Sequence, residues 1–251
     1  YRSSVKEEQS ETFKVESDSG FGVVIMNAYR NSDIRKQEIR DFIHYIIGVN
    51  RDKIIQLDSK ILANHNGVLG YHSVPYRVRK VPLPKVTNPL ILQTTAYTEK
   101  LAVWLKGILE EAGLPIVLKE ITFQESLQNG YTDHDTDLFI HGEVFEMNQS
   151  LSFFHFLFLN SSPLARNMEE KRDRVELLQL YANTPFDNWD KLNIQIEQSL
   201  LQSSLMIPLY YSKRSVLFSD DIMNITIKNF GYADFSKLWM KPTFKEPFTI
   251  A

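Results

Sequence analysis

The sequence predicts an α/β fold, and the prediction rests on one strand–helix–strand succession in the first half of the chain. Residues 90–94 form an apolar run typical of a buried strand, and residues 115–123, with Ile116, Leu118 and Ile121, form a second one. Between them, residues 99–112 place apolar side chains at helical spacing, and Gly113 follows as a helix end. A strand, a helix and a strand in this order form a parallel crossover unit, the building block of α/β proteins.

The segments before this unit predict one more strand and two helices. Residues 21–26 are a short β-branched run, the pattern of a buried strand. A helix is expected over residues 34–47, with Ser32 or Asp33 as its cap and Gly48 as its end, and a short helix over 50–61 follows. The later predicted elements are a short helix over 123–128, a strand over 137–144, helices over 153–159, 172–181 and 188–204, and an extended segment over 206–218.

Residues 64–88 are rich in glycine and proline and are predicted to be loop and extended chain. An irregular stretch of this length inside a compact domain is usually functional. Its aromatic and imidazole side chains, Tyr71 and His72 among them, offer ligand contacts. The only concentrated positive charge of the sequence also lies here, and it predicts either a phosphate or sulfate contact or a solvated loop. These basic residues are Arg77, Arg79, Lys80 and Lys85.

The composition is that of a folded globular protein. Of 251 residues, 43% are hydrophobic and 24% are charged, which is enough apolar material for one large domain or two small ones. Lys and Arg number 28 against 31 Asp and Glu, so the chain lacks the basic excess of a nucleic-acid binder and we expect no direct nucleic-acid contact from it. The absence of cysteine excludes disulfides, a thiolate nucleophile and Cys-based zinc sites.

Two segments of the sequence bear on targeting, the polar start and the longest apolar run. Residues 1–20 are polar and charged and are predicted to be a leader or linker. The chain begins at Tyr1 without a signal-peptide pattern, so we expect it to be a piece of a longer protein. The longest nearly apolar run, residues 151–159, is far shorter than the roughly 20 residues that a membrane helix needs.

The common catalytic signatures are missing. The sequence has no nucleophile elbow, no phosphate-binding glycine loop, no dinucleotide glycine motif and no His-Glu-x-x-His. One cluster of metal-competent side chains lacks the glycine and the downstream glutamate of a calcium loop, so a solvated acidic turn is the first interpretation and a metal site the alternative. This cluster consists of Asp133, His134, Asp135 and Asp137. We expect neither a metal nor a cofactor.

Polar side chains gather at the end of the predicted strand over 137–144. His141, Glu143 and Glu146 lie at its carboxyl end or just past it. In open α/β sheets ligands bind at this edge, so these residues predict either hydrogen bonding to a ligand or simple solvation. The two glutamates also allow the alternative that the protein is a glycosidase-type hydrolase. That chemistry would require a fixed distance between their carboxylates.

Several segments resemble family 5 extracytoplasmic solute-binding proteins. Residues 33–55 resemble the segment in which a basic helix is followed by an Asp-Arg-x-x-Ile element, with Asn50 here where an aspartate is usual. Residues 90–123 look like that family's second lobe, and residues 137–146 like the strand that leads into its cleft. Residues 205–211 are similar to its late return from helix to strand.

The C-terminal residues 230–239 resemble the ending of SgrR-type transcriptional regulators. Such regulators join an N-terminal winged-helix DNA-binding domain to a family 5 solute-binding domain. The resemblance implies a periplasmic-binding-protein-like (type II) lobe with a mixed sheet flanked by helices. Residues 21–204 would form the second lobe, and residues 205–251 would return toward a first lobe that is not part of this sequence.

The resemblance implies a non-catalytic, ligand-sensing domain that grips a small solute by hinge closure. Tyr97 follows the end of a predicted strand. Its ring is expected either to stack on a sugar or side chain of the ligand or to cover the next helix. The expected ligand contacts are Tyr71, His72, Thr95, Tyr97, His141, Glu143 and Glu146.

The chain departs from the peptide receptors of that family at one place. They carry an Asp-Tyr-x-Asp-Pro turn that pairs with a peptide's amino terminus, whereas residues 144–148 here have no such turn and offer Glu146 as a stand-in. A sugar or sugar phosphate is therefore at least as reasonable a solute as a peptide.

Two functional settings follow from the resemblance. The first is a cytoplasmic regulator whose partners are the first lobe and an upstream DNA-binding domain. The alternative is a membrane-anchored extracellular or periplasmic receptor of an ABC importer for oligopeptides or related solutes, with the transporter permease as a partner.

Overall fold

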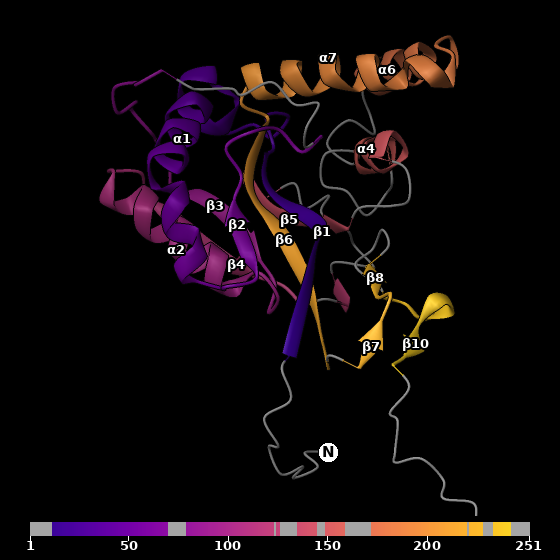
Figure 1. Ribbon diagram of the computed structural model, residues 1–251. Helices are drawn as coiled ribbons and strands as arrows, with labels where there is room; N and C mark the ends of the chain where they lie inside the picture. The colour runs from indigo at the N-terminus through magenta and orange to yellow at the C-terminus, as the bar shows by residue number, and fades with distance from the viewer. Residues whose placement is uncertain are drawn as a thin grey trace, which may run out of the picture.

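The computed structural model describes residues 12–69, 79–122, 124–125, 135–144, 149–158, 172–219, 221–227 and 233–241. These residues form a six-stranded sheet with helices on both faces, and two small two-stranded sheets (Figure 1). The expected fold class, a mixed sheet flanked by helices, is confirmed.

The main sheet has the strand order β2-β6-β1-β5-β3-β4. Its parallel part joins β3 to both β4 and β5, and the remaining neighbours are antiparallel. The predicted crossover unit is therefore present as β3, α2 and β4. The strands of this sheet are β1 (Thr12–Met26), β2 (Ile61–Ala63), β3 (Leu90–Thr94), β4 (Ile116–Glu120), β5 (Leu138–Val144) and β6 (Met206–Ser219).

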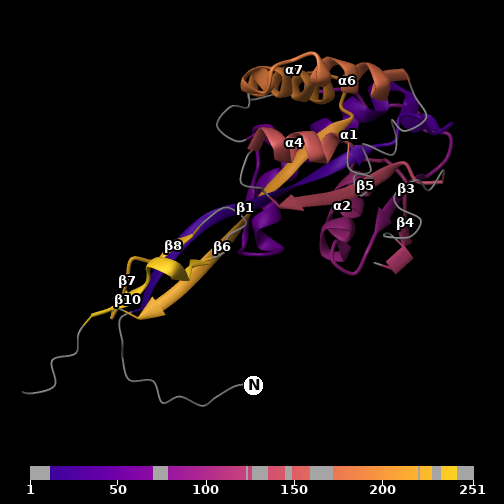
Figure 2. The same ribbon diagram turned by 90° about the vertical axis from the view of Figure 1, so that its right-hand side faces the viewer.

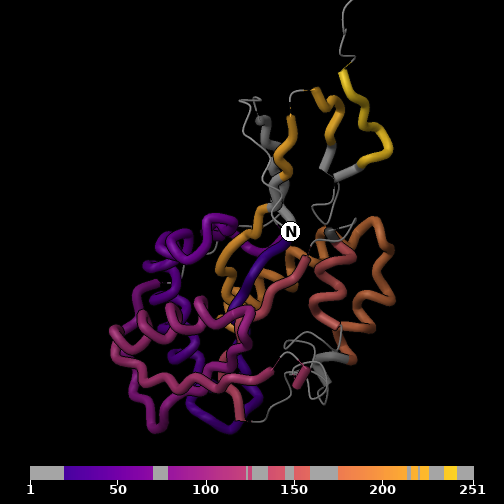
Figure 3. The backbone as a smooth tube through the Cα atoms, turned by 90° about the horizontal axis from the view of Figure 1, so that it is seen from below, coloured from indigo at the N-terminus to yellow at the C-terminus, as the bar shows by residue number. Residues whose placement is uncertain are grey.

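Helices cover the two faces of the sheet in two groups. α1 and α2 lie against one face, and α4, α6 and α7 lie on the other, as the view from below makes clear (Figure 3). The helices are α1 (Gln37–Asn50), α2 (Glu99–Glu111), α4 (Gln149–Phe158), α6 (Arg172–Ala182) and α7 (Trp189–Gln202). Short 3-10 helices are η1 (Asp33–Arg35), η2 (Arg51–Gln56), η4 (Phe186–Asn188) and η6 (Phe235–Lys237).

Alternation along the central strands divides the buried side chains into two cores. In β1, Val24 and Met26 join the core under α1 and α2, whereas Val23 and Ile25 join the core under α4 and α7. The second core is rich in aromatic rings. Because successive side chains of a strand point to opposite faces, a strand that is apolar throughout, as residues 21–26 are, fits a sheet covered on both sides.

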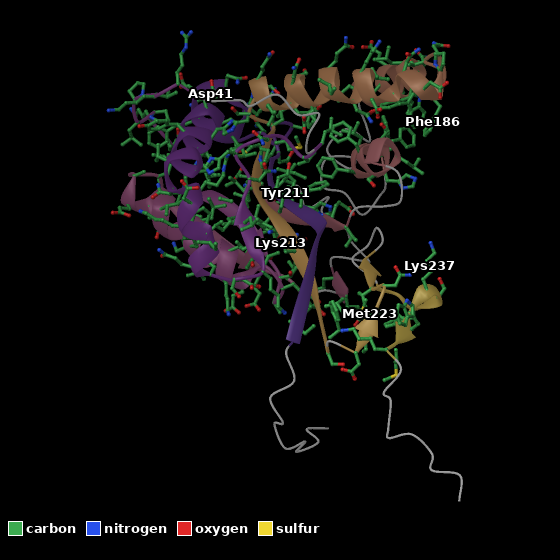
Figure 4. All side chains as sticks on the ribbon, viewed as in Figure 1. Asp41, Phe186, Tyr211, Lys213, Met223 and Lys237 are labelled. Atoms are coloured by element: carbon green, nitrogen blue, oxygen red, sulfur yellow. The ribbon has the colours of Figure 1, made fainter. Side chains whose placement is uncertain are left out.

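The outer parts of β1 and β6 extend beyond the rest of the sheet (Figure 2). Two small sheets lie beside this extension, where Met223 and Lys237 are placed, while Tyr211 and Lys213 lie on the central part of β6 (Figure 4). The short strands are β7 (Ile222–Met223), β8 (Thr226–Ile227), β9 (Ala233–Asp234) and β10 (Trp239–Met240).

Several boundaries differ from the sequence-based prediction, and three of them concern β1, α1 and β2. Residues 12–20, predicted as a leader, belong to β1, because they pair with β6 over almost their whole length. Gly48 does not end α1, which runs on to Asn50, because this glycine does not adopt the left-handed conformation of a helix C-terminal cap. Ile61 begins β2 and is not helical.

The end of α2 is as predicted. Gly113 adopts φ +96°, a left-handed conformation that side chains disfavour, and its N–H donates to the carbonyl of Glu110. This turn aims the chain into β4, which pairs with β3. No helix in the described part of the chain is long and apolar enough to cross a membrane.

Candidate functional site

The candidate site lies at the carboxyl edge of the parallel strands. β3, β4 and β5 run in the same direction, so their last residues, Thr94, Glu120 and Val144, lie toward one edge of the sheet. β1 runs the other way and pairs Gly20 with Val144, so its extension leaves the body from this same edge. The ends of the parallel strands and the point where β1 extends beyond the main sheet therefore lie at the same edge.

His141 and Glu143 form a pair on one face of β5. Nε2 of His141 lies 2.9 Å from Oε1 of Glu143. Residues two apart in a strand share a face, which is why these side chains meet. A carboxylate accepts hydrogen bonds, so the imidazole nitrogen is the donor in this pair. The imidazole is 7% exposed and the carboxylate 27%, so the pair presents its acidic member to solvent.

The Glu143 carboxylate is a hydrogen-bond acceptor whose orientation is fixed by His141. Among the described residues, His141 is the only basic side chain within 4 Å of the Glu143 carboxylate. One carboxylate oxygen is thus fixed by the imidazole, and the group keeps further acceptor capacity. Such an arrangement suits hydroxyl or ammonium donors and is unfavourable for an anion.

Aromatic packing holds the imidazole in place. The ring of His141 stacks on Phe156 of α4 with centroids 6.0 Å apart, and Phe21 of β1 meets the same Phe156 edge-on at 5.5 Å. The three rings come from three different elements, β5, α4 and β1. Sequence reasoning missed the role of Phe156, although its place in an apolar run did predict burial.

Thr95 and Tyr97 occupy the turn between β3 and α2. Thr95 is buried, and its N–H donates to Oγ1 of Thr98, which closes the turn. Tyr97 is 81% exposed, so it does not cover the core side of α2 and its ring is accessible for stacking. Gln93 of β3 pairs with Phe139 of β5. Thr95 and His141 each lie two positions beyond a member of this pair, so they lie at the same level along the two strands.

The remaining predicted contacts, Tyr71, His72 and Glu146, lie outside the described residues. The chain that leads to Tyr71 is nevertheless firmly fixed. Glu197 of α7 is fully buried, and its Oε1 accepts the N–H groups of Val68 and Leu69 at 2.5 and 3.1 Å. This anchor was not foreseen from the sequence.

Further hydrogen bonds hold the same loop. Tyr211 of β6 donates from its hydroxyl to the carbonyl of Gly67 at 2.6 Å, and Asn64 donates to that carbonyl at 3.2 Å. Arg51 of the Asn-Arg-Asp element is buried and donates to the carbonyl of Asn64. The Asn-Arg-Asp element, which resembles a family motif, thus stabilises the start of the loop through the hydrogen bond from Arg51 to Asn64.

Asp137 has a structural place in the fold. Its carboxylate accepts from Arg30 at 2.5 Å, from the Ser32 hydroxyl at 2.5 Å and from the Ile91 N–H at 2.8 Å. These three hydrogen bonds use most of the acceptor capacity of the carboxylate, which speaks against the metal alternative for this residue. Asp133 and His134 lie outside the described residues, and the described part contains no group of three metal-competent side chains.

The other histidines and the basic residues divide into buried and exposed ones. His44 is buried, with Nδ1 3.1 Å from the Ser204 hydroxyl, and burial together with the charge of Arg51 lowers the pKa of His44 to about 3. His65 is exposed and contacts Asp52 at 2.6 Å. Within the predicted basic set, the described members are exposed, in agreement with a solvated loop. These are Arg79, Lys80 and Lys85.

Comparison with known proteins identifies the fold. No protein-family model and no curated protein matches the chain. Among solved structures, NikA from Brucella suis, in complex with Fe(III)-EDTA, matches 93% of this chain with a TM-score of 0.71 at 14% identity. The ABC transporter substrate-binding protein CtaP from Listeria monocytogenes matches 93% with a TM-score of 0.70 at 13% identity.

A third structure is the oligopeptide-binding protein AppA from Bacillus subtilis in complex with a nonapeptide, which matches 92% of this chain with a TM-score of 0.60 at 14% identity. The match covers 53% of NikA, 52% of CtaP and 53% of AppA, so the chain spans about half the length of these structures. They are family 5 solute-binding proteins, and the fold of this chain is periplasmic-binding-protein-like, as the resemblance implied.

Proposed function

We propose that this chain is one lobe of a solute-binding protein that grips a small solute without transforming it. The observation that carries the proposal is the His141–Glu143 pair, a partly exposed hydrogen-bond acceptor at the carboxyl edge of a periplasmic-binding-protein-like sheet. The lobe expected from the sequence, residues 21–204, also includes the first half of β6, which pairs with β1 and β2 in the main sheet, and the chain after β6 leads toward a first lobe. The contacts are made by Thr95, Tyr97, His141 and Glu143, together with Tyr71, His72 and Glu146.

An importer receptor is the better-supported setting. The structural neighbours include an ABC transporter substrate-binding protein and an oligopeptide-binding protein, and these support a receptor outside the membrane that delivers its solute to a permease. The SgrR-type regulator rests on the C-terminal resemblance alone. A winged-helix pattern upstream of Tyr1 in the full-length protein would favour the regulator, and a signal peptide or lipobox would favour the receptor.

The solute class follows from charge. Among the described residues no Lys or Arg pairs with Glu143, and its acceptor character favours a solute with hydroxyl or ammonium donors at this point, such as a sugar or a peptide. A phosphate group would meet a like charge here. Of the solutes expected from the sequence, a sugar phosphate is therefore the least favoured at this position.

A thermal-shift screen of the full-length protein tests the proposal. The panel is dipeptides, oligopeptides, sugars, sugar phosphates and chelated metal ions. A solute at a hundred times its Kd stabilises the folded state by about 2.7 kcal/mol, which raises Tm by about 5–10 °C for a domain of this size. Stabilisation by one class that Glu143→Gln abolishes supports the proposal; a flat response across the panel contradicts it.

The hydrolase alternative requires both glutamates of the carboxyl edge. Replacing Glu143 and Glu146 together by glutamine and following the solute by mass spectrometry separates the two functions. A non-catalytic lobe leaves the solute intact with either protein. Turnover by the wild type that disappears in the double variant would make the chain an enzyme.

A further inference from the structure

β4 is the last strand of the main sheet, at the end opposite to β2, so one of its edges faces no other described strand of this sheet (Figure 2). The N–H of Leu90 donates to the carbonyl of Pro115, and Leu90 is the ladder partner of Ile116. In a parallel ladder this means that the odd-numbered residues of β4 bond to β3, whereas the even-numbered ones point their N–H and C=O groups away from it. The outward residues are Ile116, Leu118 and Glu120.

The outward backbone groups of β4 are only partly used by the protein. Nζ of Lys106 on α2 donates to the carbonyl of Ile116 at 2.6 Å, and it also contacts Glu110 one turn further along the helix. Within the described ranges of the chain, the outward N–H and C=O groups of Leu118 and Glu120 have no hydrogen-bond partner. Such an edge offers donors and acceptors at the spacing that another strand requires.

We propose that a second copy of this chain adds to this edge, with the β4 strands of the two copies pairing antiparallel so that their main sheets become continuous. A strand that pairs with its own copy across a two-fold axis perpendicular to the sheet is necessarily antiparallel to it. This axis keeps the α2 helices of both copies on the same side of the joined sheet. The association needs no solute, so it stands or falls independently of the proposed function.

The outward groups restrict the register of the two β4 strands. Hydrogen-bonded pairs form only between residues whose backbone groups face the other strand, so even-numbered residues must meet even-numbered ones. The overlap is longest when Leu118 meets Leu118 of the second copy, and Ile116 then meets Glu120 in both directions. A register centred on Lys119 would place two like charges directly opposite each other, which is destabilising. A register centred on Val117 would leave Glu120 without a partner in β4.

The side chains are complementary in the register centred on Leu118. On the side of α2, Glu120 of one copy lies opposite Ile116 of the other, and Lys106 contacts the carbonyl of that residue, so a carboxylate meets an ammonium group across the junction. On the other side, Val117 lies opposite Lys119. The side chain of Val117 is 49% exposed, and the aliphatic stem of the lysine is long enough to cover it.

Sedimentation of the full-length protein over a range of concentrations tests the proposal. Val117→Lys places a like charge opposite Lys119 at two symmetric points, so it is expected to raise the Kd of the dimer about tenfold. Val49→Lys, the same change at an exposed valine of α1, is the matched control and leaves the Kd unchanged. Val117→Lys combined with Lys119→Glu restores opposite charges and should recover the association. A wild-type protein that stays monomeric, or equal association of wild type and Val117→Lys, overturns the proposal.

Disulfide trapping tests the register itself. Val117 and Lys119 of different copies form a non-hydrogen-bonded pair, in which the Cα atoms lie about 4.5 Å apart, within the range of a disulfide. Oxidation of a mixture of Val117→Cys and Lys119→Cys proteins is expected to link positions 117 and 119, as identified by mass spectrometry of the peptides. Val49→Cys mixed with Lys119→Cys is the control and forms no such link. A dimer without the link between positions 117 and 119 uses another surface and contradicts the proposal.

Discussion

The carboxylate of Glu197 occupies the space that a side chain at Gly67 would need. A Cβ on Gly67 would lie 2.2 Å from Cδ of Glu197. The glutamate is fully buried and accepts the N–H groups of Val68 and Leu69, so it has little freedom to move aside. The glycine and the buried acid together fix the loop from which the chain continues to Tyr71.

We therefore expect Gly67→Ala to destabilise the protein. The inserted methyl group must displace Glu197 from its two N–H donors or move the loop, at a cost of about 1–3 kcal/mol. Urea unfolding followed by circular dichroism measures the change. Gly48→Ala is the control, since its Cβ meets open space in a helix and is expected to be neutral or stabilising by about 1 kcal/mol. Equal stabilities of the two variants would be evidence against the anchor.

Replacement of Glu143 by glutamine is expected to weaken solute binding without unfolding the protein. A hydrogen bond to a charged group contributes about 1.5–3 kcal/mol, so the affinity for the solute found by the screen should fall about tenfold to a hundredfold. Titration calorimetry gives the Kd. The exposed Glu111→Gln serves as the control and keeps the wild-type affinity. A wild-type Kd for Glu143→Gln would remove this residue from the site.

Asp137→Ala is expected to be strongly destabilising. The carboxylate is buried against Arg30, Ser32 and the N–H of Ile91, and its removal leaves the arginine without its partner. Loss of one member of such a pair costs about 3 kcal/mol or more. Asp135→Ala, in the same acidic turn but exposed, should change the free energy of unfolding by less than about 0.5 kcal/mol. Two similar values would mean that Asp137 has no special structural role.

Local periodicity explains which parts of the fold could be predicted. The strand–helix–strand unit over residues 90–123 follows from short-range patterns, and so does the buried strand over 21–26. The start of β1 was missed, because the alternation of Phe13 and Val15 with polar residues is short and pairs with a strand about 200 residues away. Pairing at that distance leaves no mark in the local pattern.

The candidate site likewise has features that the sequence predicts and others that depend on residues far away in the chain. His141 and Glu143 could be proposed because both lie at the end of one predicted strand, and a spacing of two places them on one face. The partner of Asp137 could not be foreseen, because Arg30 lies 107 positions away in the chain. Without that partner, Asp137 looked like a solvated or metal-binding carboxylate. The support that Phe156 gives to His141 likewise exists only in the folded chain.

Acid should destabilise the protein through His44. Its pKa is lowered to about 3 in the folded state, because burial disfavours the charged ring and Arg51 adds a like charge, whereas the ordinary value is 6.5. Below pH 6.5 the unfolded chain takes up a proton that the folded chain refuses, so stability is complete above this pH and falls as the pH decreases toward 3. The slope approaches about 1.4 kcal/mol per pH unit, or about 2 kcal/mol between pH 7 and pH 5.

The hydrogen bonds around His44 define its tautomer, while burial and the charge of Arg51 oppose a second proton. The Ser204 hydroxyl donates to Asp41 at 2.7 Å, so its oxygen accepts from Nδ1 of His44, and a second proton must go to Nε2 on a buried ring. Urea unfolding at pH 7 and pH 5 tests the prediction. His44→Gln should lose about 2 kcal/mol of the pH-dependent difference, and His65→Gln, at an exposed position, should keep it. The same difference in wild type and His44→Gln would assign the acid sensitivity to other groups.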